Sequence, residues 1–277
     1  MKHLLLVAAM TQVMFLSACA QSDSTAPHQP EATQGSQAAA DAPAQPSEQA
    51  AATSTQPGEA ETIDSLEEKI LALRGRIKSF TATIDVKFDS SQNEAWVKSH
   101  TYGPMSYQFD GDKVLYRIDM TVETKLIGAG ADEETTETQT LMSDGEYMYQ
   151  YGTNKGQKKA YKARIDKLQS SVPSPEFFFF LRRDYDLTVL PDEKVDGKDC
   201  WVIRAAKIST EEVLQLKTLT FFRKDIPLMV KTVNYDRFDN VMQVTKISDI
   251  QIDVPVDPKQ FEFHLEPGVE LQDQTNW

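Results

Sequence analysis

The sequence predicts a mainly β (α+β) domain whose strands run antiparallel, and two observations support this prediction. From Phe80 onwards, apolar and polar residues alternate with a period of two. Such alternation is typical of a strand with one buried face and one solvated face. Short polar turns, such as Asp110-Gly111, Asp144-Gly145 and Asp196-Gly197, separate the alternating segments. Many strands joined by short turns indicate an antiparallel meander.

The N-terminus has the features of an export signal over residues 1–18. A basic start at Lys2 precedes an apolar run from Leu4 to Leu16 that is too short to span a ~30 Å hydrocarbon layer permanently. The following Leu16-Ser17-Ala18-Cys19 resembles the bacterial lipoprotein signal, which implies cleavage before Cys19 and acylation of Cys19. The alternative is an ordinary cleavage site followed by an incidental cysteine. Two or three acyl chains would anchor the mature chain stably to a membrane.

Residues 19–61 are predicted to form a disordered tether. The segment after Cys19 consists mainly of Ala, Gln, Ser, Thr, Pro and Glu and has no aromatic residue, Lys or Arg. It therefore offers too little apolar surface to offset the entropy of ordering it. About forty flexible residues reach roughly 35 Å, enough to hold a folded domain clear of lipid headgroups. The remaining stretch, residues 62–277, has the length of one β-rich domain.

An amphipathic helix is predicted at the start of this domain. Apolar residues recur at spacings of three and four, which places them on one helical stripe: Ile63, Leu66, Ile70, Leu73, Ile77 and Phe80. Asp64 or Ser65 can cap its N-terminus, and Ser65 with Glu68 fits a capping box.

Strands are then predicted along the rest of the chain. We expect them at about residues 80–88, 94–102, 105–109, 114–124, 137–143, 147–151, 158–163, 185–190, 200–206, 216–223, 228–235 and 241–254.

A second helix interrupts the strands. Ser174-Pro175-Glu176 supplies an N-cap, a proline at the first helical position and an acid in the first turn. Phe177-Phe178-Phe179-Phe180-Leu181 follows, so the helix is apolar all round and is expected to lie across an opening in the sheet. Alternatively, it simply completes the core. The loop at Leu126-Ile127-Gly128-Ala129-Gly130, before the acidic Asp132-Glu133-Glu134, is either an exposed apolar finger or an ordinary hairpin end.

Composition and motifs argue against several kinds of function. A formal net charge of −13 disfavours binding to nucleic acid. No P-loop, dinucleotide fingerprint, Gly-x-Ser-x-Gly elbow or zinc-ligand spacing is present, so we expect neither a cofactor nor a metal site nor catalysis. If Cys19 is acylated, Cys200 has no disulfide partner and is expected to be a small buried side chain.

The order of these elements resembles the lipoprotein-localisation superfamily, which includes LolA, LolB and outer-membrane lipoprotein-sorting homologues. The resemblance covers residues 62–277. It rests on these motifs: Ile77-Lys78-Ser79-Phe80-Thr81-Ala82, Ser174-Pro175-Glu176, Val195-Asp196-Gly197-Lys198-Asp199-Cys200-Trp201, Leu219-Thr220-Phe221-Phe222, Tyr235-Asp236-Arg237-Phe238-Asp239-Asn240, Phe261-Glu262-Phe263 and Pro267-Gly268-Val269.

The resemblance implies an incomplete antiparallel β-barrel, or half-barrel, that is covered by helices and holds acyl chains in an apolar cavity. The candidate lipid-binding residues that it implies are Phe80, Ile84, Phe88, Tyr116, Ile118, Phe177, Phe178, Phe179, Phe180 and Phe221. Which side of each strand faces inward is left open, because a one-residue slip reverses it. One departure stands out: the carrier of this superfamily has an Arg before a Pro near the start of the sheet, whereas Gly103 precedes Pro104 here, and Arg117 is the nearest strand arginine.

Two functions remain open from the sequence. The first is a monomeric, lipid-anchored protein of the bacterial cell envelope that binds acyl chains such as palmitate, or lipoproteins, for sorting or transfer. The second is a non-catalytic sensing or protein-interaction module on the same fold, with its interior filled by its own side chains. The resemblance places the anchor in the outer membrane, facing the periplasm, if the organism has one, because Ala20 rather than Asp follows Cys19.

Overall fold

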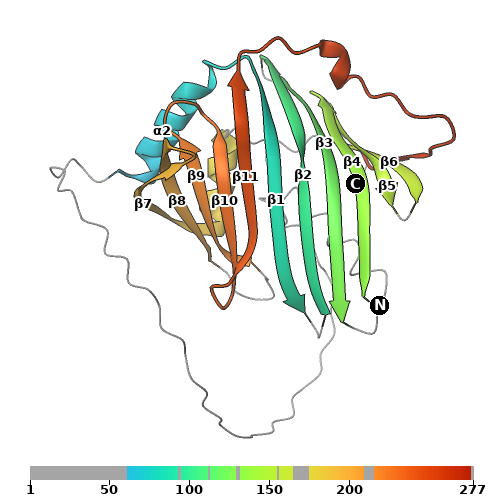
Figure 1. Ribbon diagram of the computed structural model, residues 1–277. Helices are drawn as coiled ribbons and strands as arrows, with labels where there is room; N and C mark the ends of the chain where they lie inside the picture. Colours follow the sequence, from blue (N-terminus) through green and yellow to red (C-terminus); the bar gives the residue numbers. More distant parts are fainter. Residues whose placement is uncertain are drawn as a thin grey trace, which may run out of the picture. The chain divides into compact units, whose positions relative to one another are not determined.

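The computed structural model describes residues 61–92, 95–111, 113–128, 132–154, 156–164, 175–208 and 215–275 (Figure 1). The predicted signal peptide, residues 1–18, lies outside the described residues, and so do Cys19 and the predicted tether up to residue 60.

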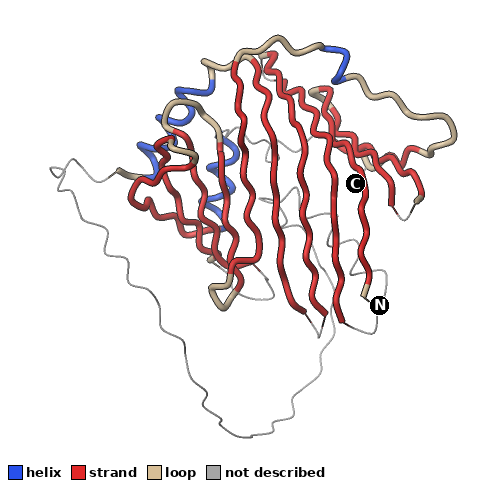
Figure 2. Tube along the Cα trace, in the orientation of Figure 1, coloured by secondary structure: helices blue, strands red, loops and turns tan. Residues whose placement is uncertain are grey.

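Two α-helices, one 3₁₀ helix and twelve strands make up the described part of the chain (Figures 1 and 2). In chain order they are α2 (Ile63–Arg74), β1 (Ser79–Gln92), β2 (Ala95–Asp110), β3 (Lys113–Gly128), β4 (Glu133–Asp144), β5 (Tyr147–Asn154), β6 (Gln157–Arg164), α3 (Pro175–Asp184), β7 (Tyr185–Val195), β8 (Lys198–Lys207), β9 (Gln215–Arg223), β10 (Met229–Asp236), β11 (Val241–Ile252), η3 (Pro258–Phe261) and β12 (Leu271–Asp273).

All the described strands belong to one open sheet. Its order is β12-β6-β5-β4-β3-β2-β1-β11-β10-β9-β8-β7, and the pairs are antiparallel except for the parallel pair of β12 with β6. Strands β1 to β6 form one meander and β7 to β11 a second, and the pairing of β1 with β11 joins them. Because β12 and β7 are the two edges and do not pair with each other, the sheet is an incomplete barrel. The predicted fold class is confirmed.

The strand register defines two faces of this sheet, since residues directly opposite on antiparallel strands point to the same side. We call the first the helix face. It carries Phe80 and Ile84 of β1 and Ile247 of β11, which lies opposite Ile84. Following opposite residues from strand to strand across β10 and β9 leads on the same face to Ile203 of β8, which packs against the helices. We call the opposite side the strap face. It carries Arg117, against which the C-terminal segment around η3 lies.

Helix α2 is shorter than the predicted apolar stripe. It ends at Arg74, so Ile77 follows the helix and Phe80 belongs to β1. The predicted cap is also displaced: Thr62 is the N-cap, and its side chain and that of Ser65 form the capping box with each other's backbone N–H. Extending the stripe to Phe80 was therefore wrong, because an i, i+3 spacing and a β alternation coincide at this position.

Several strands are longer than predicted. Strand β2 is continuous through Gly103 and Pro104, where the prediction placed a break between residues 102 and 105. The apolar Leu126 and Ile127, predicted to lie in a loop, are paired residues of β3. The short η3 and β12 were not predicted.

Helix α3 is apolar all round but is buried on one side only. Phe177, Phe178 and Leu181 are buried against Leu66 and Ile70 of α2 and against the sheet, whereas Phe179 is 63% exposed. The expectation that this helix, being apolar all round, is covered on more than one side is therefore wrong at Phe179.

This asymmetry predicts unequal costs for two neighbouring substitutions. Phe178→Ala should lower the free energy of unfolding by about 3–5 kcal/mol, because it leaves a cavity between α3 and Phe222. Phe179→Ala should change it by less than about 0.5 kcal/mol, because its ring is exposed. Urea denaturation followed by circular dichroism measures both, and equal losses would contradict the observed packing.

Candidate functional site

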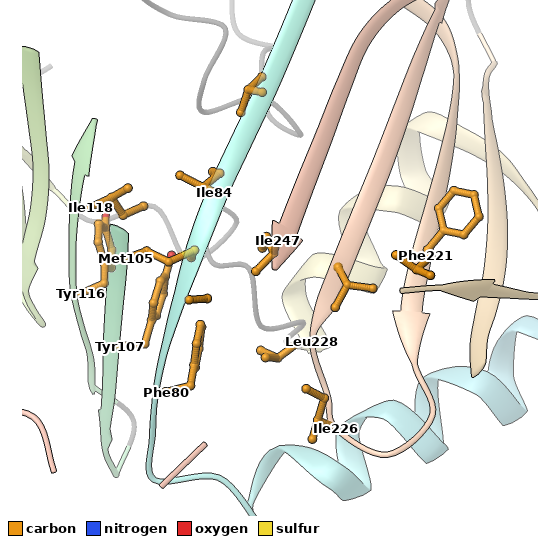
Figure 3. Close-up of a cluster of buried hydrophobic side chains, with 14 of the residues drawn as sticks. Phe80, Ile84, Met105, Tyr107, Tyr116, Ile118, Phe221, Ile226, Leu228 and Ile247 are labelled. Carbon is orange, nitrogen blue, oxygen red and sulfur yellow. The ribbon is translucent and has the colours of Figure 1, made fainter. Parts of the chain in front are cut away.

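An apolar strip runs over the helix face of β1, β2, β3 and β4. Its centre is an aromatic stack in which the Phe80 and Tyr107 ring centroids lie 4.6 Å apart and the Tyr107 and Tyr116 centroids 5.4 Å apart. The strip continues along the strands through Ile84, Met105 and Ile118 (Figure 3). Four further side chains belong to it, those of Ala82, Val86, Met120 and Leu141, and all seven are buried. From Phe80 to Val86 it extends about 20 Å at ~3.3 Å per residue.

The two helices lie beside this strip on the same face. They pack on Trp201, Ile203 and Phe222, and these form a second apolar cluster with side chains of α2 and α3. Ile226 and Leu228, from the turn between β9 and β10, belong to the same cluster as Phe80 and lie next to it in Figure 3. The helix face is therefore apolar from β8 to β4 at the end where β1 begins.

The structure brings most of the sequence-predicted residues of β1 and β3 together. Phe80, Ile84, Tyr116 and Ile118 are buried members of the apolar strip. Phe88 is half-buried and shares their face of β1, opposite Gln243 of β11. Strand β2 lies between β1 and β3, so its own buried side chains connect the two groups.

The predicted phenylalanines of α3 and β9 are dispersed. Phe177 and Phe178 lie in the helix cluster, Phe180 is half-buried under the Arg183 guanidinium, and Phe179 is exposed. Phe221 is buried but points to the strap face, because it lies opposite Val202, whereas its neighbour Phe222 lies opposite Trp201.

The predicted binding residues leave out six residues of the strip. Ala82 and Val86 were placed on the buried face of the first strand but not among the binding residues, and Met105, Tyr107, Met120 and Leu141 were missed altogether. The alternation Met105, Tyr107, Phe109 was the available signal, but the Gly103-Pro104 break hid its continuity with the preceding residues of β2.

Gly103 has a steric reason for lacking a side chain. A Cβ at this position would lie 1.9 Å from the backbone oxygen of Asp119 on β3. An Arg before Pro104 therefore does not fit between these strands, which explains physically why the carrier's Arg-Pro pair is missing.

Arg117 does not take over a role on the helix face. Its guanidinium donates to both carboxylate oxygens of Asp119, at 2.8 and 3.0 Å, and to the backbone oxygen of Gln260 beside η3, at 3.4 Å. Thr140 donates to the same carboxylate at 2.6 Å. Burial by itself would raise the pKa of Asp119, but the bonds from Arg117 and Thr140 outweigh it and the net pKa is lowered.

We call the C-terminal segment from η3 to β12 the strap, and it is held at several points along its length. The Phe263 and Tyr149 rings stack at 4.5 Å, Lys158 pairs with Glu266, and β12 adds to the edge strand β6. The contact of Arg117 with Gln260 is thus one of several that hold the C-terminal segment against the strap face.

The described residues offer little other chemistry. They contain no group of three or more His, Cys, Asp or Glu side chains that could hold a metal ion. Cys200 is buried, as predicted, and burial raises the pKa of its thiol, which disfavours the reactive thiolate. Within the same residues no helix is both long and apolar enough to cross a membrane.

No family model and no curated protein matches the chain. Among solved structures, an uncharacterised conserved protein from Thermus thermophilus is similar at 11% identity and a TM-score of 0.44, over 75% of this chain and 99% of that chain. MucB is similar at 14% identity and a TM-score of 0.44, over 73% of this chain and 62% of its own. A LolA superfamily protein from Nitrosomonas europaea is similar at 13% identity and a TM-score of 0.26, over 74% of this chain and 99% of its own.

The neighbours thus include a protein with the superfamily name that the sequence resemblance anticipates. Because the TM-scores are below 0.5, these similarities carry no argument about this chain, and what it binds is inferred below from its own residues.

The close approach at Gly103 predicts a specific cost. Gly103→Ala should lower the free energy of unfolding by about 1–3 kcal/mol, because the new methyl group forces β2 and β3 apart. Gly75→Ala is the control: Gly75 has a φ of −67° and no atom within 4 Å of the place that a Cβ would occupy, so its substitution should be neutral or slightly stabilising. Equal stability of the two variants would contradict the observed strand spacing.

The Asp119 carboxylate predicts a pH dependence. Because its folded-state pKa lies below the unfolded value of about 4, the ionised form stabilises the fold above pH 4, and this contribution disappears as the pH falls through the folded-state pKa. Asp119→Asn should cost about 0.2–1 kcal/mol at neutral pH, since the pair is partly exposed. The free energy of unfolding of the Asp119→Asn variant should then fall less steeply than that of the wild type between pH 5 and pH 2. Urea midpoints across this range measure the difference, and parallel curves would contradict the assignment.

Proposed function

We propose that this chain is a bacterial cell-envelope protein that binds acyl chains, free or as part of a lipoprotein, on the apolar strip, without catalysis. The observation that carries the proposal is the continuous apolar helix face of β1 to β4 in a sheet that does not close. A surface about 20 Å long exceeds the ~15 Å that one leaflet's acyl chains occupy in a bilayer.

The sequence supplies the location in this proposal. An acylated Cys19 anchors the chain, residues 19–61 form the tether, and residues 62–277 form the binding domain. In an organism with an outer membrane, the domain faces the periplasm. The acidic net charge of the full chain, −13, disfavours adhesion of the protein surface to anionic headgroups.

A second candidate has its own supporting observation. The aromatic stack of Phe80, Tyr107 and Tyr116 is buried to within 2% exposure, as in a solid core. This favours a non-catalytic sensing or protein-interaction module whose interior is filled by its own side chains.

Two methionines that are equally buried on opposite faces of the sheet separate the candidates. Met105 is 1% exposed on the helix face, and Met142 is 3% exposed on the strap face opposite Arg117. Met105→Gln and Met142→Gln should each lower the free energy of unfolding by about 1–3 kcal/mol, because each buries a polar amide in place of a thioether. Only Met105→Gln should weaken uptake of a fluorescent fatty acid, by about tenfold.

Native mass spectrometry of residues 62–277 is the accompanying measurement, after circular dichroism has verified folding. The wild type should retain bound lipid. Absence of both bound lipid and fatty-acid uptake would reject the proposal and favour the filled core, and equal losses of uptake in the two variants would show that the strip is not the binding surface.

A further inference from the structure

A buried polar patch interrupts the helix face between the helices and the apolar strip. The patch is formed by uncharged side chains of β9, β10 and β11: Gln215, Thr218, Thr220, Thr232, Asn234, Gln243 and Thr245. Thr218 is 1% exposed, Thr220 3% and Asn234 4%. Burying polar groups on three adjacent strands is costly unless hydrogen bonds compensate.

The register places these side chains on one surface. Thr220 lies opposite Thr232, which lies opposite Thr245, and Asn234 lies opposite Gln243. Since neighbouring strands are ~4.8 Å apart and alternate residues ~7 Å apart, the patch measures about 10 Å by 7 Å. This is the size of a glycerol or a single sugar ring.

The patch is hydrogen-bonded but carries no charge. The Asn234 Oδ1 atom accepts from the Thr218 hydroxyl at 3.0 Å and from the Gln215 amide at 3.2 Å, and the Gln243 amide donates to Thr245 at 3.1 Å. Among the described helix-face positions paired across β9, β10 and β11, below Phe222 and Met229, the ionisable residue is Asp236, a carboxylate opposite Gln215, and no Lys or Arg is present. A phosphate or carboxylate placed there would lose its hydration without meeting a cation, whereas hydroxyl groups would meet donors and acceptors.

The patch and the apolar strip are contiguous. Thr245 lies directly opposite Val86, the last member of the strip on β1, and Gln243 lies opposite Phe88. An amphiphile with its acyl chain along β1 and β2 therefore has its polar end beside the patch.

We propose that this patch selects amphiphiles with an uncharged, hydroxyl-bearing headgroup, of the glyceride class. This inference rests on the proposed acyl-chain binding and adds the headgroup chemistry to it. If the patch binds no headgroup, the same side chains are a structural network that fixes the register of β9, β10 and β11.

The test compares two probes that share an acyl chain. The full chain, purified from membranes in a mild non-ionic detergent, is incubated with photoactivatable analogues of 1-monopalmitoylglycerol and of palmitate, and the labelled peptides are quantified by mass spectrometry. The wild type should be labelled at least about tenfold more by the glyceride, at peptides of β1 to β3, as one or two hydrogen bonds to a buried headgroup allow.

The variant Thr218→Val/Asn234→Leu replaces two of the three bonded partners by apolar groups of similar shape, and the third, the half-buried Gln215 amide, can hydrogen-bond to water instead. The melting temperature of the variant should therefore change by less than about 4 °C. Its preference for the glyceride should fall towards equality. Thr232→Val, a single substitution of matched shape, should reduce the preference in the same direction and serves if the double variant does not fold. Thr140→Val, which removes a hydrogen-bonded threonine from the strap face, should leave the preference unchanged.

The outcomes separate the two proposals. If neither probe labels the wild type, acyl-chain binding itself fails. If both probes label it and the patch variants leave their ratio unchanged, or if the wild type prefers palmitate, the headgroup inference is overturned and acyl-chain binding stands.

Discussion

The pairing of β1 with β11 is the interaction on which the rest of this structure depends. It joins two meanders whose paired residues lie far apart in the chain, such as Ile84 and Ile247. Side-chain bonds reinforce its end: the Lys78 N–H donates to Asp253 at 2.8 Å and the Ser79 hydroxyl to the Val254 oxygen at 2.6 Å. A bulge in β11 opposite Ala82, with Asp249 at a φ of 53°, shifts the register by one residue, so that Ile252 and Ile247 lie opposite Phe80 and Ile84, which share one face of β1. Without this pair the apolar strip and the helix-covered cluster would belong to separate sheets.

The two faces of the joined sheet are used differently. The helices pack at one end of the helix face, where Trp201, Ile203 and Phe222 receive them. The C-terminal strap lies on the other face and adds β12 to the edge strand β6, which satisfies part of an edge that would otherwise be open to pairing with another chain. The strap therefore leaves the helix face of β1 to β4 to the apolar strip. The polar patch divides that face into regions of different polarity.

How far the sequence predicted this arrangement can be seen at particular residues. The alternation from Phe80 to Val86 placed those side chains correctly on one buried face, and Tyr116 and Ile118 joined them. The adjacent Phe221 and Phe222 could not be assigned by the same rule, because both are apolar and only pairing with Val202 and Trp201 shows which way each points. Gly103-Pro104 looked like a strand break, yet it is a place where β2 and β3 approach closely. The polar patch could not be predicted from the sequence, because Thr218 and Asn234 are ordinary strand residues and only the strand register places them opposite each other.

The sequence by itself determined the class of the domain and its antiparallel strands and turns, and it predicts an export signal with Cys19 as the expected anchor. Those features are local, because turn chemistry, strand alternation and a short apolar run each act over a few residues. Only the tertiary structure decided which faces of distant strands coincide, where α3 buries its phenylalanines, and that an uncharged polar patch adjoins an apolar strip. The physical reason is that a strand has two faces related by a shift of one residue, and only its non-local partners choose between them.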